Sequence, residues 1–162
     1  ATTPGAVRRV RLTPAQPAAS KAAVQAIMDA DVVTIGPGSW FSSVIPHILV
    51  PDIAQALNET SATVVVILNL SPEAGETHGF TTERHIHVFS QHAPQLDVDY
   101  FLADENTATS EGERDNIARA ASRLNAKVVF APMREINAEG APLNRHDPMQ
   151  LAAALKALRP AR

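Results

Sequence analysis

Residues 32–43 read VVTIGPGSWFSS and contain the transition on which the fold assignment depends. A run of β-branched apolar residues ends at Gly36, Pro37 and Gly38, residue types that are poor strand formers. Such a continuous apolar run is typical of a parallel strand that is buried on both faces. Two glycines around a proline allow a sharp turn in which the backbone can approach a ligand closely.

The rest of the chain repeats this alternation of strand and helix. Apolar runs predict three further strands, over residues 63–70, 98–103 and 128–131, and the alternation VRRVRL predicts a half-buried or edge strand over residues 7–12. Helix formers and apolar spacing predict helices over residues 18–30, 40–57 with a break near Pro46, 82–91, 113–124 and 148–158. Alternation of this kind indicates a doubly wound α/β domain with a mostly parallel sheet of about five strands.

Composition limits the partners of this domain. The 162 residues suffice for one domain with a core, and 45% hydrophobic with 19% charged residues is typical of a globular chain. A net charge of −3 argues against nucleic acid and membrane surfaces, and the absence of cysteine excludes disulfides and thiolate metal sites. No apolar run approaches the roughly 20 residues of a spanning helix, and the start lacks a signal peptide, so we expect a cytoplasmic protein.

Ligands of such sheets bind beyond the carboxyl ends of the strands, which directs attention to the loops that follow them. In the first loop, the glycine turn and nearby hydroxyl groups at a helix N-terminus predict a phosphate site. The alternative is a β-turn with a serine cap, because the GxGxxG fingerprint and the P-loop lysine are both absent. The candidate ligand-binding residues of this loop are Gly36, Pro37, Gly38, Ser39, Ser42 and Ser43.

The loop over residues 69–81 adds three candidates. The amide of Asn69 can read a base or sugar edge, and Glu76 and Thr77 can hold a ribose or a metal-bound water; the alternative is a solvated loop. We predict no metal ligands, because His85 and His87 are two residues apart on a helix and face different directions.

The last loop contributes Arg145 and His146, directly before the final helix. The guanidinium fork of Arg145 suits a phosphate or a carboxylate. The alternative gives Asp147 the helix N-cap and leaves Arg145 in a surface ion pair. No serine lies in a GxSxG elbow, which disfavours a hydrolase.

Three blocks of sequence together resemble a known family: ADVVTIGPGSWFSSVIPHILVPDIAQAL, NLSPEAGETHGFTTERHI and NRHD. They are similar to the YvcK-like gluconeogenesis factors, which belong to the superfamily of the phospholactate transferase CofD. The resemblance implies a Rossmann-like domain. It also implies that residues 1–162 form the carboxyl-terminal portion of a CofD-like domain, because the family's GGGTG loop lies in an amino-terminal half that is absent from this sequence.

The resemblance further implies a UDP-sugar ligand such as UDP-N-acetylglucosamine, with a divalent cation as a possible addition. It places Gly36, Gly38 and Ser39 at the pyrophosphate. It places Arg145 at the charged end of the ligand, and along the nucleotide cleft it places Asn69, Glu76 and Thr77. The implied role is regulatory rather than catalytic, in gluconeogenic growth, cell shape and peptidoglycan synthesis. One alternative is a CofD-like phosphoryl-group transferase. Another is an interaction module that pairs with the missing amino-terminal half or forms a homodimer.

Overall fold

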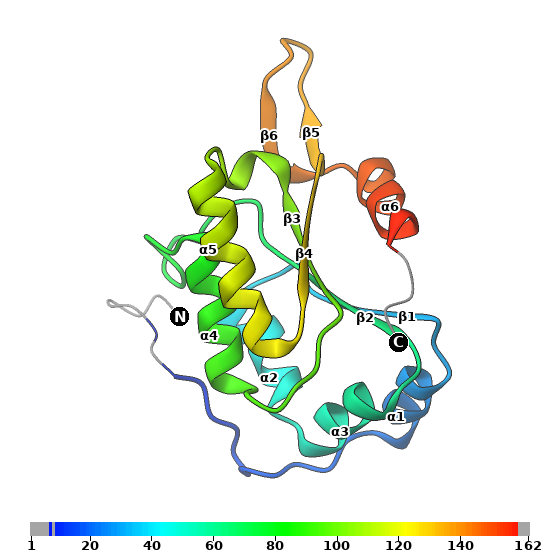
Figure 1. Cartoon of the computed structure of the whole chain (residues 1–162). Helices are drawn as coiled ribbons and strands as arrows, with labels where there is room; N and C mark the ends of the chain where they lie inside the picture. The colour runs from blue at the N-terminus through cyan, green and yellow to red at the C-terminus, as the bar shows by residue number, and fades with distance from the viewer. Residues whose placement is uncertain (1–6, 8, 159–162) are drawn as a thin grey trace.

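The computed structural model describes Val7 and residues 9–158. Its central sheet has four parallel strands in the order β1–β2–β3–β4 (Figure 1). Their bounds are Val32–Ile35 for β1, Thr63–Ile67 for β2, Tyr100–Asp104 for β3 and Lys127–Ala131 for β4. The α/β class and the parallel pairing predicted from the sequence are confirmed.

Helices cover both faces of this sheet, with α4 and α5 on one side and α6 on the other (Figure 1). The α-helices are α1 (Lys21–Met28), α2 (Ile45–Ile48), α3 (Pro51–Glu59), α4 (Thr82–His92), α5 (Glu111–Ala121) and α6 (Pro148–Ala157). Short turns complete the helical structure: a π-helical turn η1 (Trp40–Val44) and the 3₁₀ turns η2 (Glu105–Thr107) and η3 (Ser122–Leu124). No helix among the described residues is long and apolar enough to cross a membrane.

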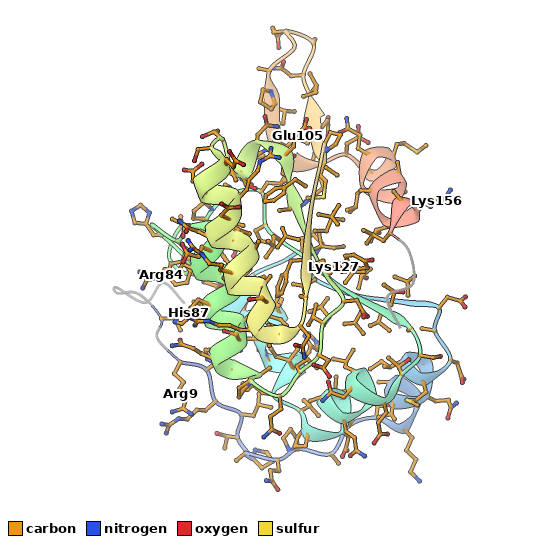
Figure 2. The ribbon with its side chains drawn as sticks, in the orientation of Figure 1. Arg9, Arg84, His87, Glu105, Lys127 and Lys156 are labelled. Carbon is orange, nitrogen blue, oxygen red and sulfur yellow. The ribbon has the colours of Figure 1, made fainter. Side chains whose placement is uncertain are left out.

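The core divides between the two faces of the sheet because successive strand residues point in opposite directions. Val64, Val66 and Phe101 face the layer that holds α4 and α5, while Val65 and Leu102 face α6. Figure 2 shows Lys156 on the side of α6 that points away from the sheet, as expected for a charged residue of an amphipathic helix. Strands with apolar residues on both faces are therefore the sequence feature that determines why helices pack on both sides of the sheet.

The strand predicted over residues 7–12 does not form in the part of this segment that the structure describes. The backbone N–H of Val10 donates to Nε2 of His92 on α4 at 3.2 Å, and Val7 and Val10 pack against the core from there. The segment thus lies against the helical layer, and the sheet has four strands rather than about five. The alternation of apolar and basic residues correctly predicted that this segment is half-buried. It did not predict that the segment packs against the helical layer and not in the sheet.

Strand β1 also departs from the prediction of burial on both faces. Val32 is 48% exposed and Thr34 is exposed, while Ile35 is buried. The reason is position: β1 is an edge strand, and α6 packs over β2, β3 and β4.

The segment between β4 and α6 was predicted as a loop, and this is wrong. It contains an antiparallel hairpin of β5 (Arg134–Ile136) and β6 (Pro142–His146), which projects from the carboxyl edge of the sheet (Figure 1). A turn around Gly140 joins the strands, and Asn137 Oδ1 accepts the backbone N–H of Ala141 at 2.8 Å. Both strands are polar, so they lack the apolar alternation by which a hairpin is usually predicted.

Candidate functional site

A glycine turn follows β1 at the carboxyl edge of the sheet. Gly36 has a φ of +79°, and a Cβ atom at this position would lie 2.9 Å from the backbone oxygen of Ile67. Asn69 fixes the turn from the end of β2, since its Oδ1 accepts the N–H of Gly38 at 3.1 Å and its Nδ2 donates to the Gly38 oxygen at 2.9 Å. The amide that was predicted to read a ligand is therefore bound to the turn itself.

The donors predicted to hold a phosphate are engaged by a carboxylate of the chain. The Ser39 hydroxyl donates to Glu76 Oε1 at 2.5 Å, and the N–H of Phe41 donates to Glu76 Oε2 at 3.3 Å. The hydroxyl groups of Ser39 and Ser42 are also hydrogen-bonded to each other. An anion that bound at these donors would have to displace Glu76.

Thr77 is fully buried rather than exposed along a cleft. Its hydroxyl accepts the N–H of Glu73 at 2.8 Å, and its own N–H donates to the Glu73 oxygen at 3.0 Å. Thr77 thus shapes the loop between β2 and α4. Ser43 lies exposed on η1, and its backbone oxygen is hydrogen-bonded to the ring of His47.

Two carboxylates of this loop lie close together. Burial is the main reason why the pKa of Glu73 is raised above its ordinary value, and the charge of Glu76 and a hydrogen bond to it raise the pKa further. The fold therefore disfavours the ionised form of Glu73 and places two acidic groups beside the predicted anion site.

This pair predicts a pH-dependent effect on stability. Because the pKa of Glu73 is raised in the folded state, stability falls as the pH rises from 4.5 through the folded-state pKa. We expect Glu73→Gln to raise the melting temperature at pH 7 and to match the wild type well below pH 4.5, where the carboxyl group is protonated in both states. Thermal unfolding followed by circular dichroism between pH 3 and pH 8 measures this, with Glu139→Gln on the hairpin turn as the control. A Glu73→Gln protein that melts no higher than the wild type at pH 7 contradicts the prediction.

The hairpin brings Arg145 and His146 to the same edge. The guanidinium of Arg145 donates to both carboxylate oxygens of Glu135 across the hairpin at 2.5 Å, and its side chain is 69% exposed. This hydrogen bond holds the pKa of Glu135 below its ordinary value. One ring nitrogen of His146 is bound to the backbone of Leu68, while its Nε2 is buried without a partner among the described residues.

These loops line an open cavity of about 330 Å³, here called cavity A. Its lining comes from residues 37–38 after β1, residues 69–71 and 73 after β2, and residues 144–146 of the hairpin. The candidates that the fold brings together there are Pro37, Gly38, Asn69, Arg145 and His146. The remaining candidates lie outside this lining, namely Gly36, Ser39, Ser42, Ser43, Glu76 and Thr77.

A second cavity, here called cavity B, adjoins cavity A and measures about 390 Å³. The two share residues 69–71, and cavity B extends between the start of α4, η2, α5 and Arg134. Asp104 at the end of β3 anchors this side, because it accepts hydrogen bonds from Arg134 Nε at 2.8 Å and from the Met133 N–H at 3.1 Å. A larger cavity of about 640 Å³ lies between residues 9–12 and α4, and it contains none of the candidates.

His85 lines cavity B and was not a predicted site residue. Its Nδ1 donates to the Thr81 oxygen at 2.9 Å, and burial is the main cause that lowers the pKa of this ring. The signal that could have found it is helix spacing, since His85 lies four residues before the core residue Phe89. His87 faces elsewhere, as predicted: its Nδ1 is 3.0 Å from Arg123 Nη1, and Figure 2 shows Arg84 and His87 on the outer side of α4. Among the described residues, no three His, Cys, Asp or Glu side chains are grouped so as to hold a metal ion.

Comparison with known proteins places these features in a family. The family model described as 2-phospho-L-lactate transferase CofD matches residues 2–146. A "Putative gluconeogenesis factor" of Mycobacterium tuberculosis is 54% identical over 155 residues, which are 96% of this chain and 44% of that protein. A relative of the same name from Deinococcus radiodurans is 37% identical over 96% of this chain and 34% of its own length. The crystal structure of a UPF0052 family protein from Bacillus halodurans superimposes with a TM-score of 0.74 and 26% identity, over 93% of this chain and 51% of that one. The chain thus spans less than half the length of these curated relatives.

Proposed function

The chain belongs to the CofD family, and on that premise we propose that the protein binds a nucleotide sugar, such as UDP-N-acetylglucosamine, at cavity A and acts as a regulator. The matched relatives carry the name of gluconeogenesis factors, which supports a role in gluconeogenic growth. We extend the proposal to cell shape and peptidoglycan synthesis, because UDP-N-acetylglucosamine supplies the sugar of the cell wall.

The observation that carries the proposal is the convergence of three loops on one cavity. A glycine turn, the end of β2 and a hairpin that bears Arg145 and His146 meet at the carboxyl edge of a parallel sheet. This edge is where sheets of this class bind their ligands. Arg145 is exposed and held by a carboxylate, so a diphosphate can replace Glu135 as the partner of its guanidinium fork.

The site contains acidic as well as basic side chains, and the acidic ones favour binding of a cation together with the ligand. Glu73 lines cavity A, and Glu76 lies beside it. A Mg²⁺ ion bound with the diphosphate would offset the repulsion between phosphate and carboxylate oxygens. Such an ion needs only one or two carboxylates, since Mg²⁺ retains water and phosphate ligands.

The second candidate function is phosphoryl-group transfer. The description of the matching family model favours it, and the Glu73–Glu76 pair supplies carboxylates of the kind that hold a catalytic Mg²⁺. The two candidates differ in one observable. A transferase consumes its nucleotide in the presence of Mg²⁺ and an acceptor, whereas a regulator returns the nucleotide sugar unchanged.

We test the binding proposal with Arg145→Ala in the protein expressed from its complete reading frame. Loss of a charge-assisted hydrogen bond to phosphate should weaken UDP-N-acetylglucosamine binding by about tenfold or more, measured by titration calorimetry. Arg123→Ala is the matched control, because Arg123 is an exposed arginine in η3 whose hydrogen-bond partner, His87, lines neither cavity A nor cavity B. Unchanged affinity in Arg145→Ala would remove Arg145 from the site. A wild-type protein that gives no heat with uridine nucleotides would refute the proposed function.

A further inference from the structure

We propose that cavity B holds the hexose ring of the ligand and that a sugar hydroxyl donates a hydrogen bond to Nε2 of His85. The inference rests on the proposed function, and it assigns a role to a cavity whose lining contains only one of the candidate residues, Asn69. It starts from a buried acceptor: His85 is 5% exposed, and its Nε2 has no hydrogen-bond partner among the described residues.

The hydrogen bond that Nδ1 of His85 makes determines whether Nε2 is a donor or an acceptor. The Thr81 oxygen is a carbonyl and can only accept, so the proton of a neutral ring lies on Nδ1. The lone pair of Nε2 is therefore an acceptor that requires a donor. Buried polar groups in folded proteins are almost always paired, so an unpaired one beside a cavity points to a ligand or a water.

The lining of cavity B favours a sugar over a nucleobase. Residues with side-chain amides and hydroxyl groups line cavity B together with His85, among them Asn106, Thr107 and Asn116. A base would need an open aromatic face on which to stack. Phe80 is only 5% exposed, and the guanidinium of Arg84 lies 4.5 Å from the centre of its ring.

The position of cavity B relative to cavity A suits an elongated ligand. In a nucleotide sugar, the diphosphate joins the hexose to the nucleoside. The two cavities share residues 69–71, so a diphosphate beside Gly38 and Arg145 can place its hexose across this boundary and into cavity B. The volume of about 390 Å³ lies within the range of small-molecule sites.

One neighbouring donor is the competing explanation. The indole N–H of Trp40 is also buried without a partner, and the Trp40 and His85 rings are edge-to-face with centroids 5.2 Å apart. A small shift or a water could join the two groups in the absence of ligand. The experiment must therefore distinguish two roles of His85 Nε2: accepting a hydrogen bond from a sugar hydroxyl, or accepting one from the indole N–H of Trp40.

The test compares UDP and UDP-N-acetylglucosamine on His85→Phe in the protein from its complete reading frame. The phenyl ring keeps the aromatic contacts, and the Thr81 oxygen keeps the backbone N–H of His85 at 3.1 Å. We expect the affinity for UDP-N-acetylglucosamine to fall about 5- to 50-fold while that for UDP changes less than about twofold. The control is His92→Phe, since His92 makes the same bond to a preceding carbonyl on α4 but its Nε2 already accepts the N–H of Val10.

Each outcome decides between the explanations. Equal losses for UDP and UDP-N-acetylglucosamine, or no loss for either, overturn the inference and leave the proposed function standing. A wild-type protein that binds neither nucleotide refutes the proposed function, and the inference falls with it. If His85→Phe does not fold, the ¹⁵N resonance of His85 Nε2 in the wild type decides the matter. It should move with UDP-N-acetylglucosamine and stay in place with UDP, and a resonance that does not respond to the sugar overturns the inference.

Discussion

Replacement of Gly36 by alanine should lower the free energy of unfolding by about 2–4 kcal/mol. Two costs add at this position: the φ of +79° is unfavourable for any residue with a Cβ atom, and that atom would lie 2.9 Å from the backbone oxygen of Ile67. Neither the turn nor β2 can relieve the contact easily, because Asn69 binds the turn at two points. Urea denaturation followed by circular dichroism measures the loss.

Gly140→Ala separates the two costs. Gly140 has a similar φ of +80°, but a Cβ atom there meets nothing within 4 Å. We expect this control to lose only about 1 kcal/mol, the conformational cost alone. If Gly36→Ala is no less stable than Gly140→Ala, the close approach of the glycine turn to β2 is not a determinant of the fold.

The second large effect should come from Asp104→Ala, with a loss of about 3–5 kcal/mol. Asp104 is 1% exposed, and its carboxylate accepts from Arg134 Nε, from the Met133 N–H and from the Asn106 N–H. Its removal would leave the Arg134 charge, which is largely buried, without its counterion and would release the hairpin from the end of β3. Since the hairpin carries Arg145, we also expect weaker ligand binding.

Glu135→Ala is the control for this prediction. It removes the other ion pair of the hairpin, Arg145–Glu135, in which the arginine is 69% exposed. Exposed pairs contribute little, so the melting temperature should not change measurably. Equal destabilisation by Asp104→Ala and Glu135→Ala would show that burial of the Asp104–Arg134 pair is not what holds the hairpin.

The parallel sheet was predictable because its signal is local. Val64, Val65 and Val66 are apolar in sequence, and this suffices to predict a strand covered on both sides. The polar hairpin was not predictable in this way, since its position depends on Asp104, about 30 residues earlier in the chain. The segment around Val10 and the outer face of β1 were misjudged for a related reason. Apolar pattern predicts burial, but it does not identify which element supplies the contact.

The candidate site, like the fold, was predictable from the sequence only in part. The rule that ligands bind at the carboxyl ends of parallel strands selected loops that the fold brings together, since Gly38, Asn69 and Arg145 line one cavity. Residue type did not predict that Glu76 binds Ser39 or that Asn69 binds Gly38, because these partners are 37 and 31 residues apart. Such pairs are set by the packing of the loops, which only the folded structure provides.

The most direct test of nucleotide-sugar binding at the carboxyl edge is a titration of the ¹⁵N-labelled complete protein with UDP-N-acetylglucosamine, followed by NMR. We predict that the backbone amides of Gly38 and His146 in cavity A and of His85 beside cavity B shift most. Those of Gly140 at the hairpin turn and Lys156 on α6 should remain in place. An absence of shifts, or shifts confined to the cavity between residues 9–12 and α4, would contradict the account.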